Sequence, residues 1–325
     1  MGKIKALHYD ALDRLRGSAL YHDQALVQTR EYRYDRLGNL LEKDGRAYRY
    51  GDCGGPYTLC GAGEDTFQYD ANGNLLSRRG GRDQTLAYTP FNKPRSIEEG
   101  GVRVEFGYGP DRLRVTKTVT RPDGQVEQIG YLGLGATGQP LYERHRAPGP
   151  DGAERIEHRD FLDVGLYAGA HHGGQPFAVH LEVDSEGDGR IDDPDTRYLH
   201  RDHLGSVVAV TDEVGLVHDP SGRTRVEPVA FAPFGRRLGP DWLDDPAAAR
   251  APGSPGHLDY TGQEALPEVG LIHMNGRLYD PELGRFLAAD PFVQAPGEPG
   301  RLRRVWGSLM LRGRSNGRVW QWHVF

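Results

Sequence analysis

The sequence predicts an all-β protein, an antiparallel sheet made of many short hairpins. A tyrosine-led motif recurs along the chain, and the segments between its copies alternate polar and apolar residues. The stretches 102–109 and 112–121 have this period of two, which is typical of strands with one buried face. Helical signals are almost absent, and the best is the short segment DDPAAARA that begins at Asp244.

The repeated motif has Tyr-Asp first, Gly or a substitute four places after the tyrosine, and Leu six places after it. Its clear copies are YDALDRL from Tyr9, YDRLGNL from Tyr34 and YDANGNL from Tyr69, and degenerate copies begin at Tyr88, Tyr108 and Phe231. A recurrence of about 20 residues is too short for a helical repeat and suits one hairpin per unit. Tyr is a strong strand former whose hydroxyl reaches water or a polar partner.

The residues after each tyrosine predict the turn of the hairpin. A type I turn favours Asp at its first place and Gly at its last, as in the pairs Asp35–Gly38 and Asp70–Gly73. The Gly supplies the positive φ that returns the chain in a hairpin with a bulge. At the matching place the sequence also has two residues that tolerate the left-handed region, Asp13 and Asn92.

The composition limits the function classes. The 325 residues carry a net charge of −6, which gives no basic footprint and argues against nucleic acid as the main partner. No apolar run reaches the length of a membrane-spanning helix. The first residues, MGKIKALHYD, lack the apolar core of a signal peptide, so we expect a chain made in the cytoplasm that leaves, if it does, by a route reading no such signal.

Two cysteines lie in the glycine-rich stretch GDCGGPYTLCG, which begins at Gly51. Cys53 and Cys60 could close a small disulfide or bind a metal, but two ligands do not make a zinc site. We expect two loop thiols without a special role.

The repeats resemble the YD repeats of the Rhs family, over roughly residues 5–299 and most weakly between about 117 and 195. Three later stretches are similar to the repeat-associated core of that family: YLHRDHLGSVVAVTDEVG from Tyr198, FAPFGRRL from Phe231, and YTGQEALPEVGLIHMNGRLYDPELGRFLAADP from Tyr260. The resemblance divides the chain into YD repeats at 1–120, a divergent region with an acidic loop at 121–196, the core at 197–299, and a basic tail at 300–325 that we expect to be disordered.

The resemblance implies a spiralling sheet that forms part of a hollow, shell-like assembly. In the family the shell holds a variable C-terminal segment, often a toxin, and members are secreted or exposed at the cell surface. About six units are too few for a complete shell, so we expect the closing end of one. The implied partners are the rest of a longer chain, its toxin cargo, a secretion-system spike or glycans. A cell-surface adhesin that binds carbohydrate is the alternative from another class.

Family members often cut themselves at an aspartic-type site, in which two carboxylates share a proton. The resemblance maps Arg277 and Asp290 onto the family's Arg and first Asp, and we interpret Asp280 as structural. The family's later Asp-Pro-x-Gly motif is missing, and the tail after Pro299 has no Asp or Glu. We therefore expect no enzyme activity. A residual protease would need a second acid, and the candidates are Asp259, Glu264 and Glu268.

The acidic stretch DSEGDGRIDDPD follows the ligand spacing of a calcium loop. Its ligand places one, three, five, seven, nine and twelve are Asp184, Glu186, Asp188, Arg190, Asp192 and Asp195. The last place has Asp instead of the longer Glu, and the flanking stretches FAVHLEV and TRYLH predict strands where such a loop has helices. A solvated hairpin loop and weak calcium binding both remain open. Calcium is the one cofactor that the sequence suggests.

Four histidines raise the question of a further site. His200 and His203 flank Asp202 in the core stretch, and His171 and His172 lie near glycine-rich turns. Three-residue spacing on a strand or turn does not place two imidazoles on one metal reliably. We expect the Asp-His-Leu-Gly stretch to be structural, with side chains that bond turn backbone.

Overall fold

The computed structural model describes residues 2–134, 140–149, 152–162, 175–192, 194–215, 217–218, 229–251 and 254–290. The chain divides into two compact units. Unit 1 comprises Met1–Thr85 with Tyr279–Phe325, and unit 2 comprises Leu86–Leu278. These units follow other boundaries than the four segments expected from the sequence.

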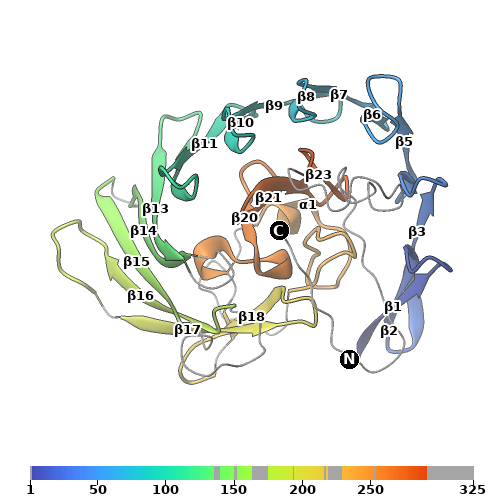
Figure 1. The fold of residues 1–325 in the computed structure, drawn as a ribbon. Helices are drawn as coiled ribbons and strands as arrows, with labels where there is room; N and C mark the ends of the chain where they lie inside the picture. The colour runs from blue at the N-terminus through green and yellow to red at the C-terminus, as the bar shows by residue number, and fades with distance from the viewer. Residues whose placement is uncertain are drawn as a thin grey trace. The chain divides into compact units, whose positions relative to one another are not determined.

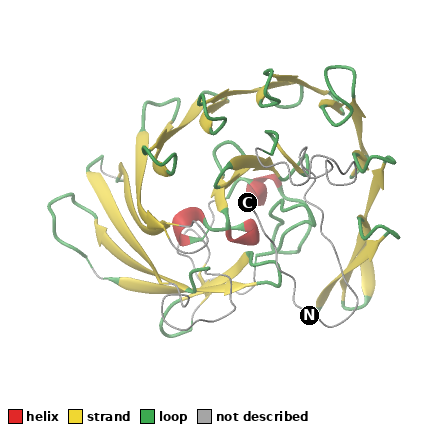
Figure 2. Ribbon diagram, in the orientation of Figure 1, coloured by secondary structure: helices red, strands yellow, loops and turns green. Residues whose placement is uncertain are grey.

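The all-β prediction is confirmed, because nearly every described element is a strand (Figures 1 and 2). Nineteen strands form one sheet in which each strand pairs antiparallel with the next along the chain. The strands that begin it are β1 (Lys3–Tyr9), β2 (Leu15–His22), β3 (Ala25–Tyr34), β4 (Leu40–Lys43), β5 (Arg46–Tyr50), β6 (Leu59–Ala62), β7 (Asp65–Tyr69), β8 (Leu75–Arg79) and β9 (Gln84–Tyr88).

Unit 2 continues the sheet with longer strands. They are β10 (Pro94–Glu99), β11 (Val102–Tyr108), β12 (Arg114–Thr120), β13 (Val126–Leu134), β14 (Pro140–Pro148), β15 (Glu154–Leu162), β16 (Ala178–Asp184), β17 (Asp195–Arg201), β18 (Val207–Thr211) and β19 (Val217–His218). The strands predicted on both sides of the acidic stretch are therefore present as β16 and β17.

A second, four-stranded sheet follows in the core stretch. Its members are β20 (Glu264–Leu266), β21 (Leu271–Met274), β22 (Arg277–Asp280) and β23 (Arg285–Phe286), preceded by α1 (Pro246–Ala249) and the 3-10 turns η2 (Pro255–His257) and η3 (Tyr260–Gly262). The helix expected near Asp244 is α1, whose first turn is capped by Asp245 through the amide of Ala247 at 2.9 Å. None of the helices in the described ranges is long and apolar enough to cross a membrane.

The predicted turns are present with their bulges. The amide of Gly73 donates to the carbonyl of Asp70 at 3.0 Å, and the pairing register of β7 with β8 shifts at Tyr69. Gly73 has φ of +80°, and Asp13 holds the same place with φ of +57°. The positive φ at this place favours glycine, aspartate and asparagine, and in the copy at Tyr108 it is adopted by Arg112 with φ of +62°.

The aspartate of each motif closes its turn with its side chain. Asp70 Oδ1 accepts hydrogen bonds from the amides of Asn72 and Asn74 at 2.9 Å, and Asn74 Nδ2 donates to Asp70 Oδ2 at 2.8 Å. Asn39 makes the same two contacts with Asp35: its amide donates to Asp35 Oδ1 and its Nδ2 donates to Asp35 Oδ2, both at 2.8 Å. This carboxylate satisfies turn amides that face no strand, so its place in the motif has a local physical cause.

In the copies at Tyr34 and Tyr69, the tyrosine joins its strand to the one before. Tyr69 Oη donates to the carbonyl of Leu59 at 2.9 Å, and Tyr34 Oη donates to that of Leu15 at 2.9 Å. Burial raises the pKa of Tyr69 to about 12, and the nearby Arg285 offsets this only in part. The hydroxyl therefore keeps its proton and its hydrogen bond at every physiological pH.

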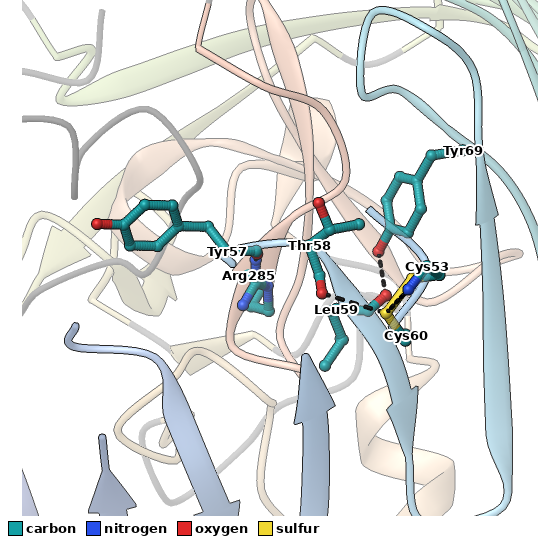
Figure 3. The surroundings of a disulfide bond; sticks show 7 residues. All are labelled: Cys53, Tyr57, Thr58, Leu59, Cys60, Tyr69 and Arg285. Atoms are coloured by element: carbon teal, nitrogen blue, oxygen red, sulfur yellow. Dashed lines mark hydrogen bonds between the residues drawn. A yellow bond between two sulfur atoms is a disulfide. The ribbon is translucent and has the colours of Figure 1, made fainter. Parts of the chain in front are cut away.

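One copy of the motif is hidden in the sequence at Tyr50. Its hydroxyl donates to the carbonyl of Leu40 at 3.0 Å, as the other tyrosines do to theirs. The turn after this tyrosine is longer, and Cys53 and Cys60 close it with a disulfide bond (Figure 3). The expectation of two loop thiols was wrong, because the hairpin brings the two side chains together at its turn.

Candidate functional site

The residues mapped onto the family's protease lie in different compact units. Arg277 begins β22 in unit 2 and is 7% exposed. Asp290 is half-buried and belongs to unit 1, where it is the last residue that the structure describes. Each is thus placed within its own unit.

Asp280 has the contacts of a structural residue. Its Oδ1 accepts the amides of Glu282 at 2.8 Å and Leu283 at 3.0 Å, which closes the Tyr-Asp-Pro turn as Asp70 closes its own. Its Oδ2 accepts Arg78 Nη1 at 3.1 Å, and the residue is fully buried. Both oxygens are therefore occupied by donors of unit 1.

A buried ionic network in unit 1 includes this turn. Arg78 Nε donates to Asp65 Oδ2 at 2.7 Å, and Arg82 pairs with Glu282 at 3.2 Å. Burial opposes ionisation of Asp65, but the hydrogen bond and charge of Arg78 outweigh it and hold the pKa of that carboxyl below its usual value. The network fixes the segment after Asp280 through side chains of β7 and β8.

The same segment is also held by backbone acceptors. Lys43 Nζ donates to the carbonyl of Glu282 at 2.8 Å, and Tyr48 Oη donates to that of Leu283 at 3.1 Å. The amide of Leu75 donates to the carbonyl of Leu287 at 2.8 Å. Residues 280–287, which we call the closing segment, are thereby bound to β4, β5 and β8.

Unit 2 contains a second buried charge cluster, centred on Glu264 of β20. Lys117 Nζ donates to Glu264 Oε1 at 2.8 Å, Tyr131 Oη donates at 3.0 Å, and Arg114 completes the cluster. Lys117 is fully buried. Burial opposes ionisation of Glu264, but the cations of Arg114 and Lys117 prevail and hold its pKa well below the usual range. The cluster binds β20 to the sheet strands β12 and β13.

Two further acids of unit 2 have raised pKa values. Burial raises the pKa of Glu143 to about 7, against the opposing charge of Arg159 at 3.3 Å. Burial likewise raises the pKa of Asp259 to about 6, against Arg237 at 3.3 Å. A pair of carboxylates with separated pKa values is the pattern of an acid and a base. Glu264 has the lowered pKa that would make it the base of such a pair. Both of its oxygens are, however, engaged by cations or by Tyr131, so the carboxylate is suited to binding β20 and not to activating a water.

The sequence indicates Asp259, Glu264 and Glu268 only as candidate acids, and it does not indicate their partners. One signal was available in the sequence. Lys117 and Val119 alternate along β12 and share its buried face, and a lysine on such a face needs a buried anion. The identity of that anion could not be predicted, because Glu264 lies far along the chain in another sheet.

In the acidic stretch, the carboxylate at the first ligand place accepts hydrogen bonds from backbone amides. Asp184 accepts the amides of Gly187 at 2.6 Å, Asp188 at 3.1 Å and Gly189 at 2.8 Å. Across the described ranges, no three His, Cys, Asp or Glu side chains are grouped so that they could hold a metal ion. Calcium binding by this stretch stays a prediction.

Three further acids of the stretch have local partners as well. Asp192 Oδ2 accepts the amide of Ser185 at 3.1 Å, Asp188 Oδ1 accepts that of Arg190 at 2.9 Å, and Asp195 pairs with Arg197. Glu186 lies exposed at the tip of the loop.

The Asp-His-Leu-Gly stretch is another copy of the repeat turn. Asp202 Oδ1 accepts the amides of Leu204 and Ser206 at 2.9 Å, and Gly205 has φ of +83°. His200 Nε2 lies 2.9 Å from Thr211 Oγ1. The expected structural role of this stretch is confirmed at Asp202. His171, His172 and the tail 300–325 lie outside the described residues.

The sheet of hairpins and the segments bound to it define a β-repeat scaffold. No family model matches the sequence. The chain is 26% identical over 332 residues to "Toxin protein Tse5" of Pseudomonas aeruginosa and 26% identical over 279 residues to "Double-stranded DNA deaminase toxin A" of Burkholderia cenocepacia, covering 85% and 80% of this chain. It is also 26% identical over 240 residues, 71% of this chain, to "Salivary gland surface protein 1" of Aedes aegypti.

The chain spans only part of each relative, namely 23%, 17% and 6% of their lengths in the same order. Among solved structures, "Crystal Structure of TcdB2-TccC3 without hypervariable C-terminal region" matches 94% of this chain and 16% of its own, with 16% sequence identity and a TM-score of 0.51. At this identity the match shows a shared fold. The chain is therefore similar in sequence to two bacterial toxins and one insect salivary surface protein, and similar in fold to part of the TcdB2-TccC3 structure.

Proposed function

We propose that the chain is a structural part of an Rhs-type toxin, a segment of the β-sheet shell that encloses a C-terminal cargo. The observation that carries this proposal is the repeated hairpin itself, in which Tyr69 binds the preceding strand and Asp70 closes the turn. This repeated set of contacts extends a sheet by one hairpin at a time without a thick core. The 26% identity to two bacterial toxins supports the toxin context.

The closing segment supports a role at one end of such a shell. Residues 280–287 bind the sheet of unit 1 through the buried Arg78–Asp280 pair and through three backbone acceptors. A segment held this firmly to the repeats suits a chain end that must stay in place while the residues beyond it vary. The partners in this proposal are the rest of a longer chain and its cargo, and the chain would act outside the cell that makes it.

Protease protection tests the enclosing role. The chain should be compared alone and joined to the reading frame that precedes it in its genome, with trypsin cleavage at the arginines of 301–318 as the readout. Joining should slow native cleavage on the order of tenfold or more, because access then requires local opening of the shell. Equal cleavage rates for both proteins, with the joined protein folded by circular dichroism, would contradict the proposal.

We further propose that the chain has no catalytic turnover. Glu264 holds two cations and Tyr131, and Asp259 is paired with Arg237, so these two candidate acids are already engaged by partners of their own unit. The purified, denatured chain should therefore migrate at its full 36.0 kDa after prolonged incubation. A clean cut near Asp290 that is lost in Asp290→Asn would contradict this.

A further inference from the structure

The turn after Tyr50 is closed differently from the other turns of unit 1. The motif's aspartate is replaced there by Gly51, whose amide donates to the carbonyl of Thr58 at 3.2 Å. Gly51, Gly54 and Gly55 give this turn a large conformational freedom in the absence of a cross-link. The Cys53–Cys60 bond therefore supplies the closure that Asp35 or Asp70 supplies elsewhere.

This turn provides acceptors for the closing segment. Arg285 of β23 donates through Nη2 to the carbonyl of Tyr57 at 3.0 Å and through Nη1 to Tyr50 Oη at 2.8 Å. Its guanidinium also lies over the Tyr50 ring, 5.1 Å from the centroid. Figure 3 shows Arg285 beside the disulfide-closed turn. Arg285 is only 6% exposed, so loss of these acceptors would leave a buried cation poorly solvated.

The same turn is tied to the repeats on both sides. Asn39 Nδ2 of the preceding repeat donates to the carbonyl of Pro56 at 3.0 Å, and Tyr69 of the following repeat donates to that of Leu59. The carbonyls of residues 56, 57 and 59 are thus acceptors whose positions depend on one short, cross-linked turn.

We propose that the Cys53–Cys60 disulfide is a redox-controlled clasp on β23, opened by dithiol reductants. Cys53 is exposed and Cys60 is 9% exposed, so a thiolate of the reductant attacks Cys53 Sγ. The sulfur–sulfur bond breaks, its electron pair passes to Cys60 Sγ, and that thiolate takes a proton. The second thiol of the reductant then attacks the reductant's first sulfur, which is bonded to Cys53 Sγ in the mixed disulfide. This step releases Cys53 as a thiol and leaves the reductant as a cyclic disulfide.

Opening the turn removes the fixed acceptors of Arg285 and loosens the closing segment. The redox response itself does not depend on the enclosing role. If that role holds, which this consequence assumes, the clasp stays closed in an oxidising compartment and loosens in a reducing cytosol, next to the point where the variable segment begins.

Hydrogen exchange with mass spectrometry on the full chain tests the clasp. Dithiothreitol should raise the exchange rate of the amides in 282–287 on the order of tenfold or more, since the cross-link restricts a short loop. Exchange in 114–120 of β12 should stay unchanged. The double variant Cys53→Ser, Cys60→Ser should exchange quickly at 282–287 with or without dithiothreitol. Arg285→Gln should raise exchange there while the disulfide is intact.

Three results would overturn the clasp. The first is two titratable thiols in the air-oxidised native protein. The second is unchanged exchange at 282–287 after thiol titration has shown that the bond is reduced. The third is an equal rise at 114–120, which would show general unfolding. Each measurement on the reduced natural chain stands even if the serine variant fails to fold.

Discussion

Single residues of the repeated motif each have a separate role in the backbone of the hairpin. Tyr69 donates to a carbonyl of the strand before, Asp70 accepts the amides of its turn, and Gly73 takes the positive φ that the turn requires. The tyrosine, aspartate and glycine are therefore explained by separate causes. The sequence pattern predicted the aspartate and glycine roles from turn chemistry alone, but it left the partner of the tyrosine hydroxyl open.

Removing that hydroxyl should cost a single hydrogen bond. Tyr69→Phe leaves the carbonyl of Leu59 without its donor in a buried place, so we expect a loss of about 1 kcal/mol in the free energy of unfolding. Urea unfolding followed by circular dichroism measures it. Tyr9→Phe is the matched control, because Tyr9 is 38% exposed, and it should change stability little. Equal effects of the two variants would contradict the assigned role.

The buried carboxylate of Glu264 should matter far more. Glu264→Gln leaves Lys117 and Arg114 buried without their anion, and we expect a loss of roughly 3–5 kcal/mol. Glu98→Gln is the control, because Glu98 pairs with Arg103 at an exposed place, where a pair contributes about 1 kcal/mol or less. Urea unfolding of both variants at pH 7 gives the comparison, and a loss under about 1 kcal/mol in Glu264→Gln would refute the cluster.

Glu143 should make stability depend on pH. Its pKa in the folded chain is about 7, above the unfolded value near 4.3, so the folded state binds more protons between these limits. Stability from this group is complete below the unfolded pKa and is lost as pH rises toward 7. We therefore expect the free energy of unfolding of Glu143→Gln to rise relative to that of the natural chain as the pH increases, by on the order of 2–3 kcal/mol by pH 8.

The comparison of Glu143→Gln with the natural chain isolates this group from opposing ones. Burial lowers the pKa of His257 to about 3 and that of His273 well below its ordinary value, so both histidines favour the folded state above pH 6.5 and oppose it below. These effects are common to both proteins and cancel in the difference. Urea unfolding from pH 5 to 8 measures it, and a difference that does not change with pH would contradict the raised pKa.

At the scale of elements, the hairpin was predictable and its exceptions were not. Turn, bulge and strand order follow from local residue types, and the structure confirms them from Asp13 to Asn92. The copy at Tyr50 escaped notice because Gly51 replaces the aspartate and the turn is longer. Its disulfide depends on the hairpin geometry, which spacing alone does not reveal.

The glycine place of the turn gives a test at this scale. Gly73→Ala forces a side chain into φ of +80° and should cost roughly 1–2 kcal/mol. Gly130→Ala is the control, because an added Cβ would meet nothing within 4 Å and the backbone there is not in the left-handed region. It should be neutral or slightly stabilising in urea unfolding. A neutral Gly73→Ala would mean that the turn is not the one described.

At the scale of the whole molecule, local rules give the sheet but not the contacts that hold the closing and core segments. Those contacts join residues such as Arg78 and Asp280, or Lys117 and Glu264, that are far apart in sequence. Their pairing depends on how the sheet presents its buried charges, and no spacing rule encodes it. The mapping of Arg277 and Asp290 came from a family resemblance alone and remains a prediction.

The central claim is that these hairpins form part of a wall around an enclosed segment. Electron cryo-microscopy of the chain joined to its natural upstream reading frame tests it most directly. We expect a closed sheet in which the hairpins of Tyr34 and Tyr69 continue a row of similar upstream hairpins, with density for a separate segment inside. An open sheet would contradict this claim. So would a sheet whose hairpins pack on one another and leave no interior space.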